Sequence, residues 1–492
     1  RDSIAGVQSV QTPVNHPDEI GSLFDPSIVY AKGGRLLNML MNYIGQDDFR
    51  KGLKAYFEKH AYGNTTGNDL WAALSEASGK DIAAFMDPWL TRSGFPLVTV
   101  DQQGDSVDIK QEHFLVNPEQ ADHDRIWPVP LLASSPDVPE LLASREAQTT
   151  LTSREYVRLN EGAVGHYIVR YAQPEHAAAL AALAESQELS APERMMLLND
   201  SSMIAKAGFA SFGETLDLLS HYASEASETV WDILSVIIAD ARRFIDQDLE
   251  LEADIKRFIR GFIQRQYDRL GWEEQNGEPA SDRKLRATII GLGVYSEHED
   301  ILATALDKFE TYKADHDAVP SELRSIVLGA AVRHAAAGAF DYLLHEEETT
   351  SNPDLKQELL GALSTTRSEA EVATLLGRIK DSTKVRQHDV DTWLVYLLRN
   401  RYGRQQSWDW LRDNWSWIEK TFEGDKGYDS FPRYAASAFN TRQLFEEYKE
   451  FFEPKAGDVA LSRNIKLGVA ELASRIAWLE RDLTAVRSFF SK

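Results

Sequence analysis

Hydrophobic residues recur at helical spacing along most of this chain. In the first clear run, residues 34–44, the apolar positions fall on one face of a helix: Leu36, Leu37, Leu40, Tyr43 and Ile44. Gly45 stands where a C-terminal cap belongs. Gly33 and Gly34 stand at the start, where a backbone without Cβ atoms can come close to whatever lies in front of it. The pattern predicts a buried helix that holds Tyr30 rigidly just before its start.

Three further helices are predicted before Phe95. Candidate N-terminal caps precede them: Asp47, then Thr66 or Asn68, then Asp81. Their apolar residues form stripes at helical spacing: Phe49, Leu53, Tyr56 and Phe57; Leu70, Trp71 and Leu74; Ile82, Phe85, Met86 and Trp89. Gly79 is expected to end the second of these helices. Pro88 is expected to bend or break the third, because proline removes an internal hydrogen bond.

Between Phe95 and Pro174 the pattern changes to that of strands. Short β-branched runs at 97–100 and 107–109 flank Gly104-Asp105, which is a hairpin signal. Turn residues separate further strand candidates at the spacing of a sandwich: 126–132, 149–152, 156–159 and 167–171. This part of the chain is therefore predicted to be a small β domain.

From Pro174 onward the chain returns to helical spacing. Apolar stripes recur in units of about the length of a helix pair, for example at 230–244, 285–309, 355–379, 393–398, 408–422 and 461–490. Consecutive helix pairs of this kind predict a solenoid that resembles HEAT repeats. The acidic run Glu346-Glu347-Glu348 is expected to be a solvated loop.

Composition narrows the class of protein. The 492 residues suggest about three domains. With 53 Lys and Arg against 77 Asp and Glu, the net charge of −24 repels phosphate backbones, so we expect no nucleic-acid partner. The absence of cysteine excludes thiol catalysis, disulfides and cysteine-ligated metal, and it is compatible with a cytoplasmic location. No apolar run approaches the ~20 residues that a membrane span needs, so we expect no membrane partner.

An ordered set of motifs runs through the first part of the chain, beginning at the helix that Tyr30-Ala31-Lys32-Gly33 opens. The set also contains His16-Pro17, Leu23-Phe24-Asp25, Gly45, Phe49, Gly52, Leu53, Tyr56, His60, Asp69-Leu70-Trp71, Trp89 and Gly94-Phe95-Pro96. It resembles the zinc aminopeptidases of the aminopeptidase N family (gluzincin metallopeptidases), and bacterial members most of all. The resemblance implies a mainly α, multidomain fold. We expect the helical remainder of a thermolysin-like catalytic domain at 1–96, a β-sandwich at 97–173 and a HEAT-like α-solenoid at 174–492.

The resemblance also implies roles for two residues. In that family the tyrosine that matches Tyr30 is catalytic. A phenol is protonated at neutral pH, so it can donate a hydrogen bond to the scissile carbonyl oxygen as negative charge gathers there. Phe24 is implied to line the substrate pocket beside it.

The metal-binding motif of that family is missing from this chain. H-E-x-x-H places two histidines one turn apart on a helix, with a glutamate between them that activates water. None of the twelve histidines has another four residues away, and Thr349 stands where His345-Glu346 would need a second histidine. The chain also begins with Arg1-Asp2-Ser3 and no initiator methionine. We therefore expect it to be the C-terminal portion of a longer polypeptide whose missing N-terminal part holds the zinc.

These observations predict one function and leave one alternative open. We expect the full-length protein to be a cytoplasmic zinc aminopeptidase that removes N-terminal residues from peptides, with a helical domain that covers its active site. The chain alone, without zinc ligands, is expected to be inactive. The alternative is a metal-free helical-repeat protein that binds partners on its concave face. The chain has no phosphate loop or serine-hydrolase elbow that would suggest another chemistry.

Overall fold

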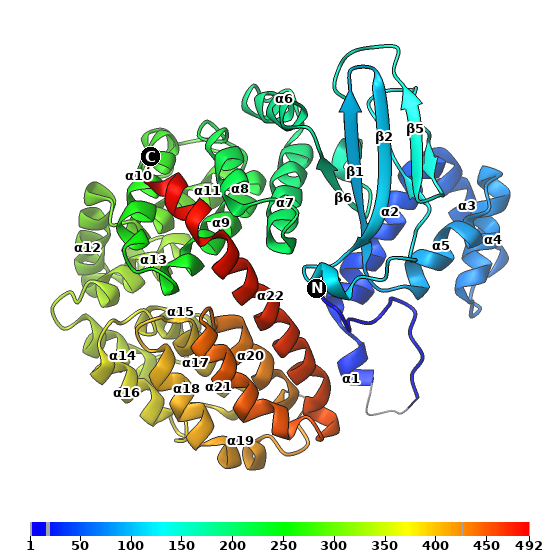
Figure 1. The fold of residues 1–492 in the computed structure, drawn as a ribbon. Helices are drawn as coiled ribbons and strands as arrows, with labels where there is room; N and C mark the ends of the chain where they lie inside the picture. The colour runs from blue at the N-terminus through cyan, green and yellow to red at the C-terminus, as the bar shows by residue number, and fades with distance from the viewer. Residues whose placement is uncertain (1, 16–19, 426, 492) are drawn as a thin grey trace. The chain divides into compact units, whose positions relative to one another are not determined.

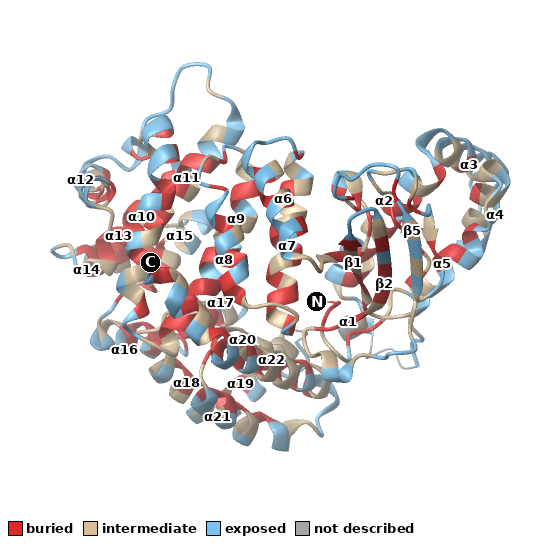
Figure 2. Cartoon of the chain, turned by 45° about the horizontal axis from the view of Figure 1, so that its top comes forward, coloured by how far each residue is buried: buried red, intermediate tan, exposed pale blue. Residues whose placement is uncertain are grey.

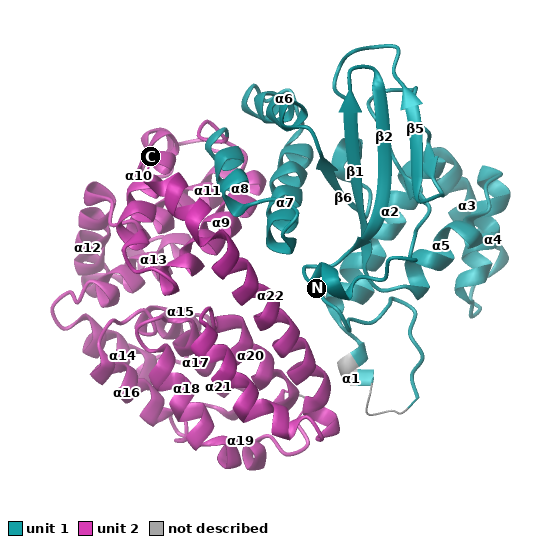
Figure 3. Ribbon diagram, in the orientation of Figure 1, with its two compact units in different colours: residues 1–221 teal, residues 222–492 magenta. Residues whose placement is uncertain are grey.

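A computed structural model describes residues 2–15, 20–425 and 427–491 of the chain. These residues are mainly helical with a few strands, which confirms the predicted fold class at that level (Figure 1). The chain forms two compact units, Arg1–His221 and Tyr222–Lys492 (Figure 3). The boundaries 1–96, 97–173 and 174–492 stay predictions, and the His16-Pro17 motif lies outside the described residues. No helix in the described part of the chain is long and apolar enough to cross a membrane.

Unit 1 begins with helices. They are α1 (Ile20–Leu23), the π-helical turn η2 (Ser27–Lys32), α2 (Gly33–Ile44), α3 (Gln46–Lys59), α4 (Gly67–Ser78) and α5 (Ile82–Thr91). Thr66 and Asp69 form a capping box at the start of α4, and Asp81 accepts a hydrogen bond from the first turn of α5, as predicted. Asp47 does not cap α3, because that helix already starts after Gly45. Pro88 does not break α5, which continues to Thr91, where the Arg92 N–H donates to the Pro88 carbonyl. The bend expected at Pro88 stays a prediction.

The predicted hairpin is confirmed. Strands β1 (Phe95–Gln103) and β2 (Ser106–Phe114) pair antiparallel around a turn in which Gly104 has a φ of +67°, a conformation that favours glycine. Strand β5 (Glu146–Thr150) pairs antiparallel with β2, and β6 (Ile168–Tyr171) pairs parallel with β1. The sheet order is β5-β2-β1-β6, and β3 (Val129–Pro130) with β4 (Leu141–Leu142) forms a separate small sheet. The β-sandwich itself stays a prediction.

Three strand predictions differ from the structure. The strand predicted at 149–152 lies at Glu146–Thr150 instead. Only Val129 and Pro130 of the run 126–132 form a strand, because Pro128 and Pro130 have no N–H to donate to a neighbour. The run 156–159 forms no strand. Its backbone donors are satisfied by side chains instead: Val157 N–H donates to Gln102 Oε1, and Leu159 N–H donates to the Tyr171 hydroxyl.

One hydrophobic core joins the helices and the sheet of unit 1 (Figure 2). Its buried members come from α2, α4, α5 and the inner face of the sheet, and they include Leu36, Met39, Leu40, Ile44, Leu74, Phe85, Trp89, Val98, Val100, Val107 and Ile109. Leu37 was predicted to lie on the same face of α2, but it is 39% exposed. The face of α2 that packs inward is therefore narrower than the sequence pattern suggests.

Three helices complete unit 1: α6 (Pro174–Glu185), α7 (Ala191–Ala207) and α8 (Phe212–Ser220). Ile204 and Ala207 of α7 belong to a second core cluster with Leu97, Phe114 and Ile168 of the sheet. One face of the sheet is therefore buried by α2, α4 and α5, and α7 covers the part of the other face around Leu97, Phe114 and Ile168.

Unit 2 is helical in the residues described. Its α-helices are α9 (Glu228–Arg243), α10 (Leu251–Leu270), α11 (Ala280–Tyr295), α12 (Glu299–Ala314), α13 (Ser321–Arg333), α14 (Ala339–Thr349), α15 (Pro353–Leu363), α16 (Glu369–Arg378), α17 (Val390–Arg399), α18 (Arg404–Asp413), α19 (Trp415–Thr421), α20 (Phe431–Ala438), α21 (Arg442–Phe452) and α22 (Val459–Phe490). Helices that follow one another pack together, as α10 does with α11 and α14 with α15. The predicted helical runs are confirmed, and the HEAT-like repeat stays a prediction.

The acidic run 346–348 is not a loop. It forms part of α14, and the Glu346 and Glu347 side chains are buried. The Tyr312 hydroxyl donates to Glu346 Oε1 at 2.7 Å, and Arg378 pairs with Glu347 at 2.8 Å and also with Glu348. A run of like charges can enter a core when hydrogen bonds and a guanidinium compensate it, and sequence composition does not reveal such partners.

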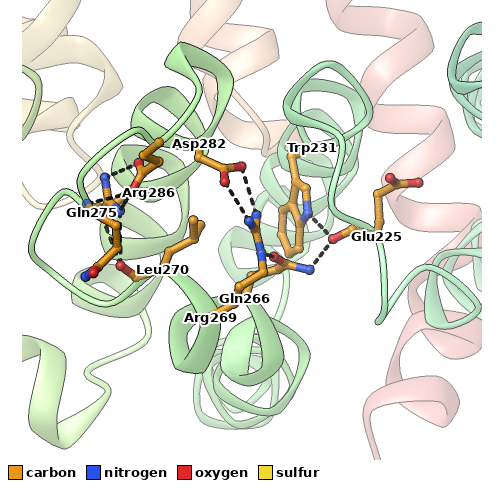
Figure 4. Close-up of polar contacts among 9 residues, drawn as sticks. Glu225, Trp231, Gln266, Arg269, Leu270, Gln275, Asp282 and Arg286 are labelled. Atoms are coloured by element: carbon orange, nitrogen blue, oxygen red, sulfur yellow. Dashed lines mark hydrogen bonds and ion pairs between the residues drawn. The ribbon is translucent and has the colours of Figure 1, made fainter.

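Polar side chains also fasten the helices of unit 2 (Figure 4). Trp231 Nε1 and Gln266 Nε2 both donate to the Glu225 carbonyl. Arg269 forms two hydrogen bonds to the Asp282 carboxylate. Arg286 forms two to Glu278 and also donates to the Leu270 carbonyl. Each guanidinium in this network has a carboxylate partner.

Candidate active site around Tyr30

Tyr30 lies in the π-helical turn η2, which leads directly into α2. The Gly33 N–H donates to the Ile28 carbonyl, five residues earlier, which is the bonding of a π-helix. Ile28 is buried at 1% exposure, whereas the Tyr30 side chain is 67% exposed. The described residues provide no hydrogen-bond partner for the Tyr30 hydroxyl. The turn therefore presents a phenol to solvent from a fixed backbone, and short π-helical segments of this kind occur often at functional sites.

Phe24 lies next to Tyr30. The two ring centroids are 5.8 Å apart with an interplanar angle of 84°, so the rings meet edge to face. Phe24 is itself 51% exposed. The structure thus brings together the two residues that the sequence singled out, and it leaves an apolar edge of each ring accessible.

Lys32 anchors the turn from the inside. Its ammonium is 2.9 Å from Asp2 Oδ2, and it donates to the carbonyls of Arg92 at 3.2 Å and Gly94 at 3.0 Å. These three acceptors match the three N–H donors of a lysine. The Gly94 N–H in turn donates to Asp2 Oδ1 at 2.8 Å. Lys32 is two residues after Tyr30, so its buried contacts fix the turn from which the phenol projects.

The electrostatics of this anchor favour the ionised pair. Burial alone would raise the pKa of Asp2, but the hydrogen bond from His166 and the charge of Lys32 hold that pKa below its usual value. Burial lowers the pKa of Lys32, and the Asp2 carboxylate opposes that shift. His166 Nε2 lies 3.4 Å from Asp2 Oδ2, and burial lowers the pKa of His166. A carboxylate, an ammonium and a largely neutral imidazole therefore meet behind the turn.

Arg35 fastens the next turn of the helix. Its Nε and Nη2 donate to the Gly165 carbonyl at 3.2 and 2.9 Å. Gly165 in turn donates to Asn160 Oδ1, so the carbonyl lies in a loop that a side chain holds in place. Lys32 and Arg35 together tie the start of α2 to residues far away in the sequence.

A stripe of the helix beside Tyr30 is open. Gly33 and Gly34 lie one helical turn after Tyr30, and Leu37 lies two turns after it. These residues therefore share one face of the helix with Tyr30. A Cβ atom on either glycine would meet none of the described residues within 4 Å. The space in front of these glycines, where a close backbone approach was expected, is therefore open and holds no neighbouring segment among the described residues. Substrate or another segment of protein has room to approach the backbone here.

The described residues do not form a site for a zinc ion. Across the described ranges, no group of three His, Cys, Asp or Glu side chains is arranged to hold a metal. His345 is exposed on α14, whereas Glu346 turns inward to Tyr312. The Thr349 hydroxyl donates to the His345 carbonyl within the same helix. No catalytic step that uses a metal can therefore be built from these side chains.

Sequence reasoning identified the exposed phenol but not its anchors. Asp2, Arg35 and His166 come from separate parts of the chain, and no local motif connects them to Tyr30. The one available signal was Lys32: two residues along a helix places it roughly opposite Tyr30, so an exposed Tyr30 implies an inward-facing lysine.

Comparison with known proteins shows which families the chain resembles. Residues 1–89 match the model of the Peptidase family M1 domain, and residues 156–473 match the ERAP1-like C-terminal domain. The chain is 36% identical to "Aminopeptidase N" of Lactococcus lactis subsp. cremoris over 494 residues, which cover 99% of this chain and 58% of that protein. It is 33% identical to "Aminopeptidase N" of Lactobacillus helveticus, with coverage of 100% and 59%.

More distant relatives match over the same extent. The chain is 26% identical to "Glutamyl aminopeptidase" of Bos taurus, over 99% of this chain and 52% of that protein. It thus spans little more than half the length of these relatives. The M1 model covers α1 to α4, the Tyr30 turn and most of α5, and the ERAP1-like model covers β6 and most of the helices after it. The chain belongs to the M1 peptidase family, with an ERAP1-like C-terminal domain over most of its length.

Proposed function

We propose that this chain is the C-terminal portion of a zinc aminopeptidase that removes N-terminal residues from peptides. Family membership supports peptide hydrolysis, and the similarity to proteins named aminopeptidase supports action at the N-terminus. The zinc ion would be held by residues outside this chain. Its contribution would be to polarise the peptide carbonyl and to activate water. A cytoplasmic location and a lack of nucleic-acid and membrane partners stay predictions from composition.

In this proposal Tyr30 donates a hydrogen bond to the scissile carbonyl oxygen. The observation that carries it is an exposed phenol with no partner among the described residues, projecting from a turn that Lys32 anchors. A donor that is already fixed in place stabilises charge that develops in the transition state without reorganising. Phe24 would contact the substrate beside it, because its ring meets Tyr30 edge to face and is half exposed.

The test is Tyr30→Phe in the full-length enzyme, which keeps the ring and removes the hydroxyl. We expect kcat and kcat/KM to fall together by about 10²–10³-fold with KM nearly unchanged, because the hydrogen bond is made mainly in the transition state. Zinc content and Tm should stay at the values of the unmodified enzyme, since Tyr30 is exposed.

Tyr62→Phe is the matched control, because Tyr62 is a fully exposed tyrosine of the same unit. It should leave both constants unchanged. A peptide with a free amino terminus should be cleaved and its N-acetylated form should not. Turnover near normal in Tyr30→Phe at full zinc occupancy would show that Tyr30 is not the donor, and cleavage of the acetylated peptide would rule out an aminopeptidase.

A further inference from the structure

Unit 2 contains a cavity of about 360 Å³ where several helices end. Arg243, Tyr295, Arg333, Arg399 and Ala438 line it, and each is the last residue of its helix: α9, α11, α13, α17 and α20. A cavity of this size is within the range that binds small molecules. The lining residues are brought together only by the packing of these helices.

The lining is strongly basic, although the chain as a whole is acidic. Six arginines line the cavity, namely Arg242, Arg243, Arg333, Arg399, Arg401 and Arg404, against two carboxylates, Asp246 and Glu252. The chain has a net charge of −24, so this concentration of positive charge runs against its overall composition. Helix C-termini carry partial negative charge, which explains why arginines are tolerated at these positions.

Three of the arginines have carboxylate partners and three do not. Arg404 pairs with Asp246, Arg401 with Glu252 and Arg243 with Asp240. No ion pair or hydrogen bond to a carboxylate is found for Arg242, Arg333 or Arg399 in the described structure. This differs from the neighbouring network in Figure 4, where Arg269 is matched by Asp282 and Arg286 by Glu278.

Arg333 is the one of these three arginines whose buried donor atom, Nε, lacks a hydrogen-bond partner in the described structure. Burial and the nearby charges of Arg367 and Arg242 lower its pKa, so an anion placed here would relieve an unfavourable site. Arg242 stacks on the Tyr295 ring at 3.5 Å and Arg333 lies 5.6 Å from the same ring, which holds both guanidinium groups at one place.

We propose that this cavity binds a small molecule through an oxyanion group, a carboxylate or a phosphate, that pairs with Arg242 and Arg333. Guanidinium groups present a planar fork of donors that matches either oxyanion. The Tyr295 ring, already stacked on one guanidinium, forms an apolar wall for the rest of the ligand. The cavity has no lining residue in common with the Tyr30 turn, and the proposal does not depend on the proposed peptidase activity.

Titration calorimetry on the 492-residue chain tests the proposal, with inorganic phosphate and succinate as separate probes. At least one should bind at a single site, and the tighter probe identifies which oxyanion the site prefers. Arg333→Gln should weaken that binding by about 10–100-fold, because a charge-assisted hydrogen bond is lost. Arg333→Lys keeps the charge but loses the planar fork of donors. Its affinity for the probe should lie between those of the unmodified chain and Arg333→Gln.

Arg386→Gln is the control, because Arg386 is an exposed arginine of the same unit that pairs with Asp389 at 2.7 Å. It should bind as the unmodified chain does. If Arg333→Gln does not fold by circular dichroism, Arg242→Gln takes its place with the same expected loss. Failure of both probes to bind at millimolar concentration, or equal weakening in Arg333→Gln and Arg386→Gln, would overturn the proposal.

Discussion

Lys32 illustrates how a single charged residue can be structural and still matter to a functional site. Its side chain is 1% exposed in a chain whose lysines lie mostly at the surface, and its three donors each have an acceptor. Burying an ammonium is unfavourable unless it is paired and hydrogen-bonded, so this arrangement holds only while Asp2 remains ionised. The residue that fixes the Tyr30 turn is therefore one that touches no substrate in our proposal.

Lys32→Met should destabilise unit 1 by about 3–5 kcal/mol, because it leaves the Asp2 carboxylate buried without its ammonium partner. Urea unfolding would measure the loss. The double variant Lys32→Met/Asp2→Asn should recover part of it, since the uncompensated charge is gone. Lys51→Met removes an exposed pair with Asp48 and should leave the stability nearly unchanged, because solvent screens an exposed ion pair. Equal losses for Lys32→Met and Lys51→Met would contradict the anchor.

At the scale of elements, the start of α6 shows how a helix is tied to the sheet by a neutral histidine. His176 is fully buried, lies against the rings of Tyr156 and Tyr171, and its Nε2 is 2.9 Å from the Val157 carbonyl. That geometry requires Nε2 to donate. Burial lowers the pKa of His176 to about 4, so the folded protein keeps this ring neutral well below the ordinary value near 6.5.

Acid should therefore weaken unit 1. Between pH 6.5 and pH 4 the unfolded chain binds a proton on this ring and the folded chain does not, so lowering the pH favours unfolding. For His176 the loss between pH 7 and pH 5 is on the order of 2 kcal/mol. His176→Phe should reduce the pH dependence of urea unfolding by about that amount, even if the variant is less stable at pH 7. An unchanged slope would show that His176 is not responsible.

At the scale of the whole molecule, the compact units and the expected domains divide the chain differently. The second unit starts at Tyr222, whereas the sequence pattern places the last boundary between 173 and 174. The difference is the segment α6 to α8, whose α7 buries Ile204 and Ala207 against strand residues Leu97 and Ile168. Those contacts are apolar and would be lost if the segment were separated from the sheet.

A fragment 222–492 should therefore fold cooperatively by itself, and a fragment 174–492 should be no more stable despite its extra helices. Thermal melting followed by circular dichroism would compare them, with binding of a hydrophobic dye as a measure of exposed apolar surface. We expect more dye binding in 174–492, because its α7 face has lost the sheet. If fragment 174–492 melts cooperatively and fragment 222–492 does not, the result would support the boundary that the sequence pattern predicts.

The sequence by itself determined what depends on near neighbours in the chain. Helical periodicity located α2 and the helices of unit 2, the capping residues Thr66 and Asp81 marked two helix starts, and Gly104 marked the hairpin. These signals are local because the hydrogen bonds and side-chain faces of a helix or hairpin involve residues only a few positions apart. The short motifs around Tyr30 and Phe24, together with the family resemblance, were enough to single out these two residues.

Only the tertiary structure decided which charged residues are buried and with what partners. Glu347 looked like part of a solvated run, and nothing local in the sequence marked Lys32 as buried. Each lies inside with an opposite charge from a distant segment. The arginine cavity likewise gathers Arg242, Arg333 and Arg399 from three helix ends. Whether a charge can be buried depends on partners far away in the sequence, because the desolvation of an ion is offset only by contacts that the complete fold supplies.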